Sequence, residues 1–170
     1  EIQNKIDKNS DLKIISELKG YASIIETNKT INEARLSALK AFSSFIHAGI
    51  AFSSGDIIEA ELLSNDSIKK IHEGIIMLDK AERNWKNIDE SWDFFEPGEY
   101  IQSLEEIETL KEGYLDAELL FESMQNYYLS MEDLILEDNV SFEEKYNKYE
   151  EGLEKLSESV FFGSWAQYLL

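Results

Sequence analysis

The stretch that decides the fold is IETLKEGYLDAELLFESMQNYYLSMEDLI, residues 107–135. Its apolar side chains recur at alternating spacings of three and four residues, which places them on one face of an α-helix. No charged residue interrupts this seam, which consists of Ile107, Leu110, Tyr114, Ala117, Phe121, Met124, Tyr128, Met131 and Ile135. With Pro97 accommodated in its first turn, the helix would span about 39 residues. A helix of this kind has to bury its seam against neighbouring helices.

The N-terminal part of the chain predicts another long helix. We expect it to begin near Ser10-Asp11 and to end at Phe52, with Gly20 and residues 27–30 as places where it could break. Residues 1–10 are polar and read as a leader or tether rather than a folded element. The inner face of this helix is predicted from its apolar spacing to be Ile31, Ala34, Ala38, Ala41, Phe45, Ala48 and Phe52.

Two further helices complete the predicted fold. Asp56 can cap the second helix, which could kink at residues 64–66 and carries Glu82 as a misfit on its apolar face. Ser141 with Glu144 forms a capping box for the last helix. The sequence therefore predicts an all-α fold, an up-down-up-down four-helix bundle of long helices. We expect one domain over residues 11–170.

The composition excludes several classes of function. The 170 residues contain no cysteine, which rules out thiol catalysis, zinc–thiolate sites and disulfides. The net charge is −19, so direct nucleic-acid binding by phosphate neutralisation is not expected. Residues 91–170 alone carry −16. We interpret this charge either as a solvated face or as a binding surface for a basic protein, with these candidates: Glu105, Glu108, Glu112, Asp116, Glu150, Glu151, Glu154 and Glu158.

The histidines do not point to a metal or catalytic site. Only His47 and His72 occur, and neither is preceded three residues earlier by the glutamate that di-iron carboxylate bundles use. There is no HExxH, EF-hand loop, haem-attachment motif or phosphate-binding glycine loop. We therefore predict no enzyme activity, no metal and no cofactor.

The first helix carries a second apolar row beside its inner face: Leu39, Phe42, Ile46 and Ile50. A helix that is apolar on both sides is either buried or faces a partner. Two coverings are open. The C-terminal FFGSWAQYLL, residues 161–170, could fold back over the row, or a second molecule could cover it, as in a homodimer through the first helix.

The connection SWDFFEPG, residues 91–98, holds three large aromatic side chains: Trp92, Phe94 and Phe95. One interpretation is a hydrophobic cap over Trp85 and Tyr100 at one end of the bundle. The other is an exposed knob for recognition of a protein partner, because aromatic residues are enriched at interface hot spots.

These observations favour a non-enzymatic helical interaction module. A start at Glu1 without Met, the polar leader and the absence of cysteine suggest an exported or surface-attached bacterial domain, with membrane attachment only through a tether outside this chain. The longest uncharged run, residues 41–55, is too short to span a membrane. Two alternatives stay open: an acidic, immunity-type inhibitor, for which a cytoplasmic location also fits, and the ligand-sensing ectodomain of a membrane receptor.

Overall fold

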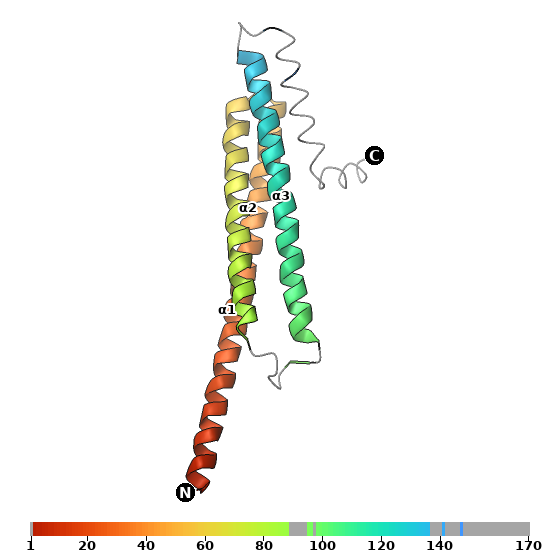
Figure 1. The fold of residues 1–170 in the computed structure, drawn as a ribbon. Helices are drawn as coiled ribbons and strands as arrows, with labels where there is room; N and C mark the ends of the chain where they lie inside the picture. Colours follow the sequence, from red (N-terminus) through yellow and green to blue (C-terminus); the bar gives the residue numbers. More distant parts are fainter. Residues whose placement is uncertain (1, 89–94, 97, 137–140, 142–146, 148–170) are drawn as a thin grey trace.

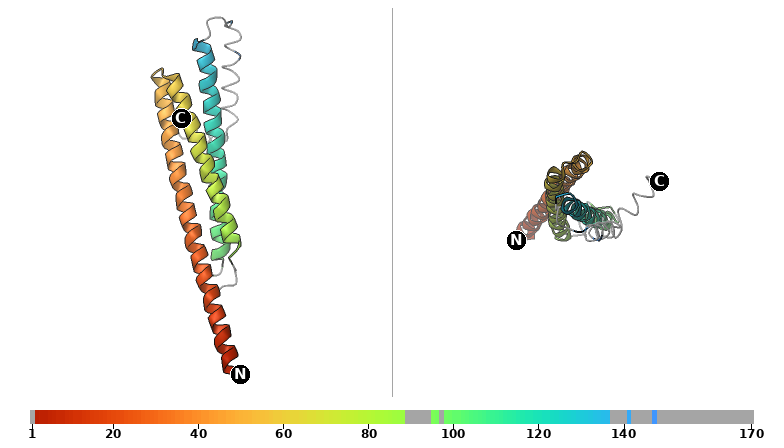
Figure 2. Two further views of the ribbon diagram at one scale, coloured as in Figure 1. Left: turned by 90° about the vertical axis from the view of Figure 1, so that its left-hand side faces the viewer. Right: turned by 90° about the horizontal axis from the view of Figure 1, so that it is seen from above.

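The computed structural model describes residues 2–88, 95, 96, 98–136, 141 and 147. Its regular elements are three α-helices, α1 (Ile2–Ser53), α2 (Ile57–Lys86) and α3 (Glu99–Leu136). They run up, down and up, and α2 packs against both α1 and α3 (Figures 1 and 2). The all-α expectation is confirmed for these residues. The predicted fourth helix lies outside them, except for Ser141 and Asn147.

Helix α1 is continuous from Ile2 to Ser53, so the predicted break at residues 27–30 is wrong. The buried Thr30 donates its hydroxyl hydrogen to the carbonyl of Glu26 at 2.8 Å, which satisfies this polar group inside the helix. Residues 2–10 continue the helix, and their role as a leader stays a prediction. The N-terminal end of α1 extends past the connection between α2 and α3 (Figure 1).

The ends of α2 and α3 follow local signals in the sequence. Gly55 has φ +88°, a left-handed conformation that favours glycine and turns the chain out of α1. Asp56 caps α2 as predicted, because its side chain accepts a hydrogen bond from the Glu59 amide at 3.1 Å. Helix α2 runs without interruption through residues 64–66. Helix α3 begins at Glu99, after Gly98 with φ +89°, and Pro97 lies outside the described residues.

The core follows the predicted seams. At mid-height, Ala41 of α1, Ile71 of α2 and Phe121 of α3 are completely buried in one cluster. Phe121 stacks on Phe45 at 4.6 Å between ring centroids. The inner face of α1 is built mainly from small side chains, including Ala34, which is also fully buried. Small residues let α1 approach α2 closely, so the packing of these two helices depends on backbone proximity.

A second cluster lies beyond this core toward the turn between α1 and α2. Tyr128 of α3 is almost completely buried and stacks on Phe52 of α1 at 4.7 Å. Burial raises the pKa of Tyr128 to about 12, and the neighbouring Tyr127 adds to the shift. The phenol therefore stays neutral at physiological pH.

Candidate functional site

One face of α1 carries large apolar side chains on the side opposite its inner face. From Ile14 to Ile50, eleven positions recur every three or four residues over about ten helical turns, and eight of them are large and apolar. Every one of them is exposed. We call this set the outer stripe: Ile14, Leu18, Tyr21, Ile25, Asn28, Asn32, Leu36, Leu39, Ser43, Ile46 and Ile50. At about 100° per residue the positions stay close to one line, so the stripe runs straight along the helix.

The exposure of this stripe is unusual for such hydrophobic side chains. Leu39 is 68% exposed and Ile46 is 59% exposed, whereas Ala41 on the inner face is 0% exposed. Single exposed leucines are common on soluble proteins, but a contiguous apolar patch marks a binding surface. The outer stripe carries two groups of such exposed side chains, one on each side of Asn28 and Asn32.

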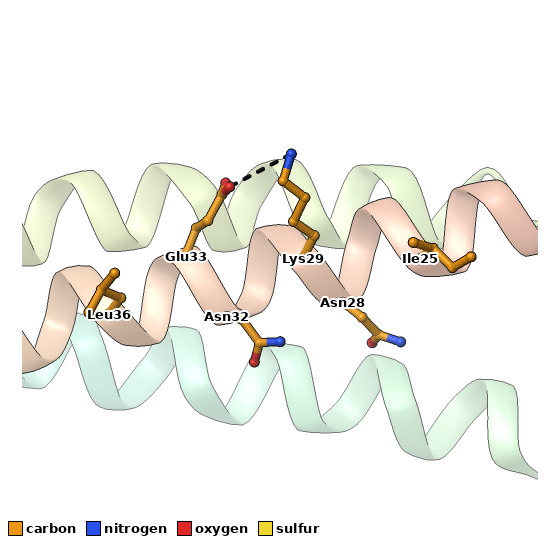
Figure 3. Close-up of a pocket in the computed structure, with 6 residues that line it drawn as sticks. All are labelled: Ile25, Asn28, Lys29, Asn32, Glu33 and Leu36. Carbon is orange, nitrogen blue, oxygen red and sulfur yellow. Dashed lines mark ion pairs between the residues drawn. The ribbon is translucent and has the colours of Figure 1, made fainter.

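The middle of the stripe is polar and forms a shallow groove that is wide open to solvent and lined by side chains of α1 alone. Figure 3 looks onto this groove, which Ile25 and Leu36 border along the helix. Asn28 and Asn32 project side by side from the edge nearer α3 (Figure 3). Lys29 and Glu33 form an ion pair of 3.9 Å on the edge nearer α2 (Figure 3). The groove therefore offers amide donors and acceptors between two apolar segments.

Sequence reasoning identified the C-terminal half of this surface. Three of its four predicted residues, Leu39, Ile46 and Ile50, are exposed on the outer stripe. The fourth, Phe42, is half-buried and packs edge-on against Phe121 at 5.2 Å, so it belongs to the side of the core. The sequence reasoning missed the N-terminal half, including Leu18, although the same three-four spacing continues through it.

The aromatic connection contributes to a third cluster at the other end of the bundle. The Phe95 ring lies 5.8 Å from Trp85 and 5.7 Å from Tyr100, measured between ring centroids. The Trp85 indole donates a hydrogen bond to the Tyr100 carbonyl at 3.0 Å. Phe95 therefore contacts the two side chains that the cap interpretation names, and the choice between a cap and a recognition knob stays a prediction. Trp92 and Phe94 lie outside the described residues.

A serine, a lysine and an aspartate meet between α1 and α2. Ser44 donates to Asp66 at 2.6 Å, and Lys70 donates to both Ser44, at 3.1 Å, and Asp66. The Lys70 and Ser44 hydrogen bonds lower the pKa of Asp66. A nucleophilic serine needs a neutral base and free amide donors for an oxyanion. Here the lysine is paired with a carboxylate and Ser44 lies inside a helix, so the cluster links the two helices.

Glu82, the misfit of the predicted α2 seam, also has a structural explanation. It is half-buried and pairs with Lys86 of its own helix and, at 3.3 Å, with Lys111 of α3. Lys111 pairs with Asp79 as well. The Lys86 hydrogen bond, followed by that of Lys111, lowers the pKa of Glu82. The carboxylate does not have to reach open water, because cations from two helices neutralise it.

The predicted acidic surface is described only on α3. Glu105, Glu108 and Glu112 are exposed, and Asp116 is half-buried. Glu108 lies 3.9 Å from Lys86. The remaining candidates lie outside the described residues: Glu150, Glu151, Glu154 and Glu158. Binding of a basic partner to this surface stays a prediction.

Both histidines are exposed and engaged in local contacts. His47 Nδ1 lies 2.7 Å from the Ser43 carbonyl, one turn earlier on α1. His72 Nδ1 lies 2.8 Å from Glu118 Oε1, which joins α2 to α3. Among the described residues, no group of three or more histidine, aspartate or glutamate side chains is arranged to hold a metal ion.

An enclosed cavity between α1 and α3 is small. It measures about 60 Å³ and is lined by residues that include Arg35, Trp85 and Leu110. This space suits one or two water molecules rather than an organic ligand, which needs about 300 Å³ or more.

No helix in the described part of the chain is long and apolar enough to cross a membrane. No protein family, no curated protein and no solved structure matches this chain.

Proposed function

We propose that this protein is a non-enzymatic helical interaction module that binds a helix of a protein partner along the outer stripe of α1. The observation that carries the proposal is the exposure of the stripe's large apolar side chains, with Leu39 at 68%, while the alanines of the same helix are buried. Removing apolar surface from water is favourable by about 25 cal/mol per Å². Covering this stripe with another helix is the direct way to gain that energy.

The spacing of the stripe fits recognition of a helix. Anchors at three-residue and four-residue spacings on one helix pack into the spaces between the anchors of another. Asn28 and Asn32 add hydrogen-bonding groups that an all-apolar partner would leave unpaired, which costs free energy. Apolar anchors supply affinity and the polar centre supplies specificity for a partner with matching groups.

The setting that fits this function best is an exported or surface-attached bacterial domain with a polar N-terminal leader. A ligand-sensing ectodomain stays an alternative that needs a pocket for its ligand, and the cavity of about 60 Å³ that described residues line between the helices is too small to be that pocket. An acidic inhibitor would use the exposed carboxylates of α3, such as Glu105 and Glu112. That surface can be explained by solvation alone, whereas the apolar outer stripe cannot.

Site-specific photo-crosslinking in the bacterial host tests the proposal. A photoreactive residue at Leu39 is expected to give a discrete protein adduct, because this position lies within the outer stripe. The matched control is Leu119, which is 54% exposed on α3. An adduct from Leu39 and none from Leu119 supports the proposal. No adduct at either position, or equal labelling at both, overturns it.

A further inference from the structure

The occupant of the outer stripe can be identified more closely. We infer that it is a second copy of this chain, docked antiparallel so that the two α1 helices cross at Asn32. This inference rests on the proposed function, since it names the partner of the same surface. Three properties of the stripe point to it: its local charge, the symmetry of its spacing and its polar centre. The charges along its edges are compatible with it.

The local charge allows two copies to meet at α1. The whole chain carries −19, so most approaches of one copy to another are repulsive. Residues 1–54, which include α1, carry seven basic and six acidic groups and have a net charge of +1. The surface that exposes the apolar stripe is therefore also the part of the chain where like-charge repulsion is weakest.

The spacing of the stripe is the same in both directions from Asn32. Toward the C-terminus the steps are four, three, four, three and four residues, and toward the N-terminus they are identical. In an antiparallel pair centred on Asn32, every stripe position therefore meets a stripe position of the other copy. Leu39 faces Ile25, Ile46 faces Leu18 and Ile50 faces Ile14. Three of the five pairs on each side of Asn32 are therefore apolar on apolar, whereas Leu36 faces Asn28 and Tyr21 faces Ser43.

The centre of the pair places two identical amides opposite each other. An asparagine side chain has both a donor and an acceptor, so Asn32 of one copy can donate to Asn32 of the other and accept from it. A buried asparagine in a helix seam sets register and oligomeric state at some cost in stability. An apolar partner segment would pack well on Ile25 and Leu36 but would leave the Asn32 side-chain amide without a hydrogen-bond partner.

The edges of the stripe are compatible with the antiparallel orientation. In that orientation each edge meets the same edge of the second copy, and Lys29 lies about half a turn from Glu33 of the second copy. The reciprocal contact forms as well, which extends the 3.9 Å pair within each chain into a four-charge cluster. A parallel pair joins opposite edges instead and places Glu33 about half a turn from Arg35 of the second copy, so cysteine crosslinking has to decide the orientation.

The stripe is also long enough for a stable dimer. From Ile14 to Ile50 it extends about 54 Å at 1.5 Å per residue. A strip about 10 Å wide along this length is on the scale of the roughly 800 Å² that each partner contributes to a standard interface. The pairing also gives the N-terminal end of α1, which extends past the bundle, a helix to pack against (Figure 1).

Sedimentation of the full chain at micromolar concentration tests the dimer. The expected mass is twice the 19.6 kDa of one chain. Ile46→Glu places a charge within the seam and is expected to give the single-chain mass. Ile76→Glu is the matched control, since Ile76 is 53% exposed on α2 and lies outside the stripe. A single-chain mass for the unmodified protein, which the alternative covering by residues 161–170 would give, overturns the inference.

A second variant guards against loss of folding. Asn32 is exposed within one chain, so Asn32→Asp leaves the helices intact, as circular dichroism should confirm. In the antiparallel dimer the two carboxylates face each other, and their repulsion is expected to separate the copies at pH 7. Dimers should return below about pH 4, where the carboxyl groups are protonated. A dimer of Asn32→Asp at pH 7 overturns the inference.

Cysteine crosslinking tests the orientation, because the chain has no cysteine of its own. When copies with Ile25→Cys and copies with Leu39→Cys are mixed under oxidising conditions, a disulfide between the two variants supports the antiparallel pair. Disulfides only within each variant indicate a parallel pair and overturn the antiparallel arrangement.

In the photo-crosslinking experiment, an adduct with a different protein overturns the second-copy inference but not the proposed function. Absence of any adduct overturns both.

Discussion

The two faces of α1 reverse the usual relation between side-chain size and burial. On the inner face the fully buried residues are alanines such as Ala34, Ala41 and Ala48. On the outer face Leu36, Leu39 and the isoleucines of the stripe are more than half exposed. Hydrophobicity alone would place the large aliphatic side chains inside. Burial on this helix is therefore decided by how closely the neighbouring helix approaches.

The polar contacts of the inner face show why the close approach matters. Ser37 of α1 donates to the Lys70 carbonyl of α2 at 2.8 Å, and Ser44 donates to Asp66 at 2.6 Å. A short side chain can reach such a partner only when the two backbones are close. Larger inner residues would separate α1 from α2 and break these hydrogen bonds. The outer face has no such constraint from α2 or α3, so it can carry large side chains.

The largest expected effect comes from adding the same side chain to the two faces. Ala41→Leu overfills a fully buried site beside Ile71 and Phe121 and should lower the free energy of unfolding by about 2 kcal/mol. Ser43→Leu, two residues along the helix, adds a leucine to the exposed stripe and should change it by less than about 0.5 kcal/mol. Urea denaturation of both variants measures the difference. Equal losses would contradict the distinction between the faces.

The sequence predicts the fold well where apolar spacing is the deciding signal. The seam from Ile107 to Tyr128 faces the core as expected, and the Asp56 cap follows from a local rule. The predicted break at residues 27–30 is wrong, because weak helix propensity does not reveal that Thr30 satisfies its hydroxyl within the helix. Propensity is a weak signal when tertiary packing supports a helix.

The candidate site could be predicted only in part. Spacing revealed a second apolar row but could not assign Phe42 to the core, because that depends on Phe121 of a helix about 80 residues away in sequence. The bonds of Glu82 to Lys111 likewise depend on the relative rotation of α2 and α3. The sequence pattern locates faces of single helices, whereas the pairing of residues between helices requires the packed structure.

Glycine substitutions sharpen the same comparison with a smaller effect. Gly113→Ala on exposed α3 adds a methyl group to open space and should stabilise the protein by about 0.8 kcal/mol through helix propensity. At Gly74 the added Cβ would lie 3.2 Å from the Tyr114 ring and 3.4 Å from the Ala34 carbonyl oxygen. In Gly74→Ala this crowding should cancel the stabilisation from helix propensity. The free energies of unfolding of the two variants should therefore differ by about 1 kcal/mol, as measured by thermal or urea unfolding. Equal stabilisation of the two variants would show that the packing around Gly74 has space for an additional methyl group.

The smallest expected effect concerns the polar contact between the same two helices. The pKa of Asp66 is lowered by Lys70 and then Ser44, so its carboxylate stabilises the fold above the ordinary value of 3.8 and loses this contribution as the pH falls through the lowered pKa. Because the Asp66 side chain is 41% exposed, water screens the interaction. Asp66→Asn should therefore cost about 0.5–1 kcal/mol at pH 7.

The pH dependence separates this contact from a packing effect. Below the lowered pKa the unmodified aspartic acid is neutral like asparagine, so the difference between the two proteins should shrink toward zero in acid. Urea unfolding of both proteins at pH 7 and at a series of pH values that descends below 3.8 measures this difference. A difference that persists unchanged in acid would mean that Asp66 acts through shape rather than charge. The close approach of α1 and α2 would then rest on the small residues Ala34, Ala41 and Gly74 and on the hydrogen bond from Ser37 to the Lys70 carbonyl.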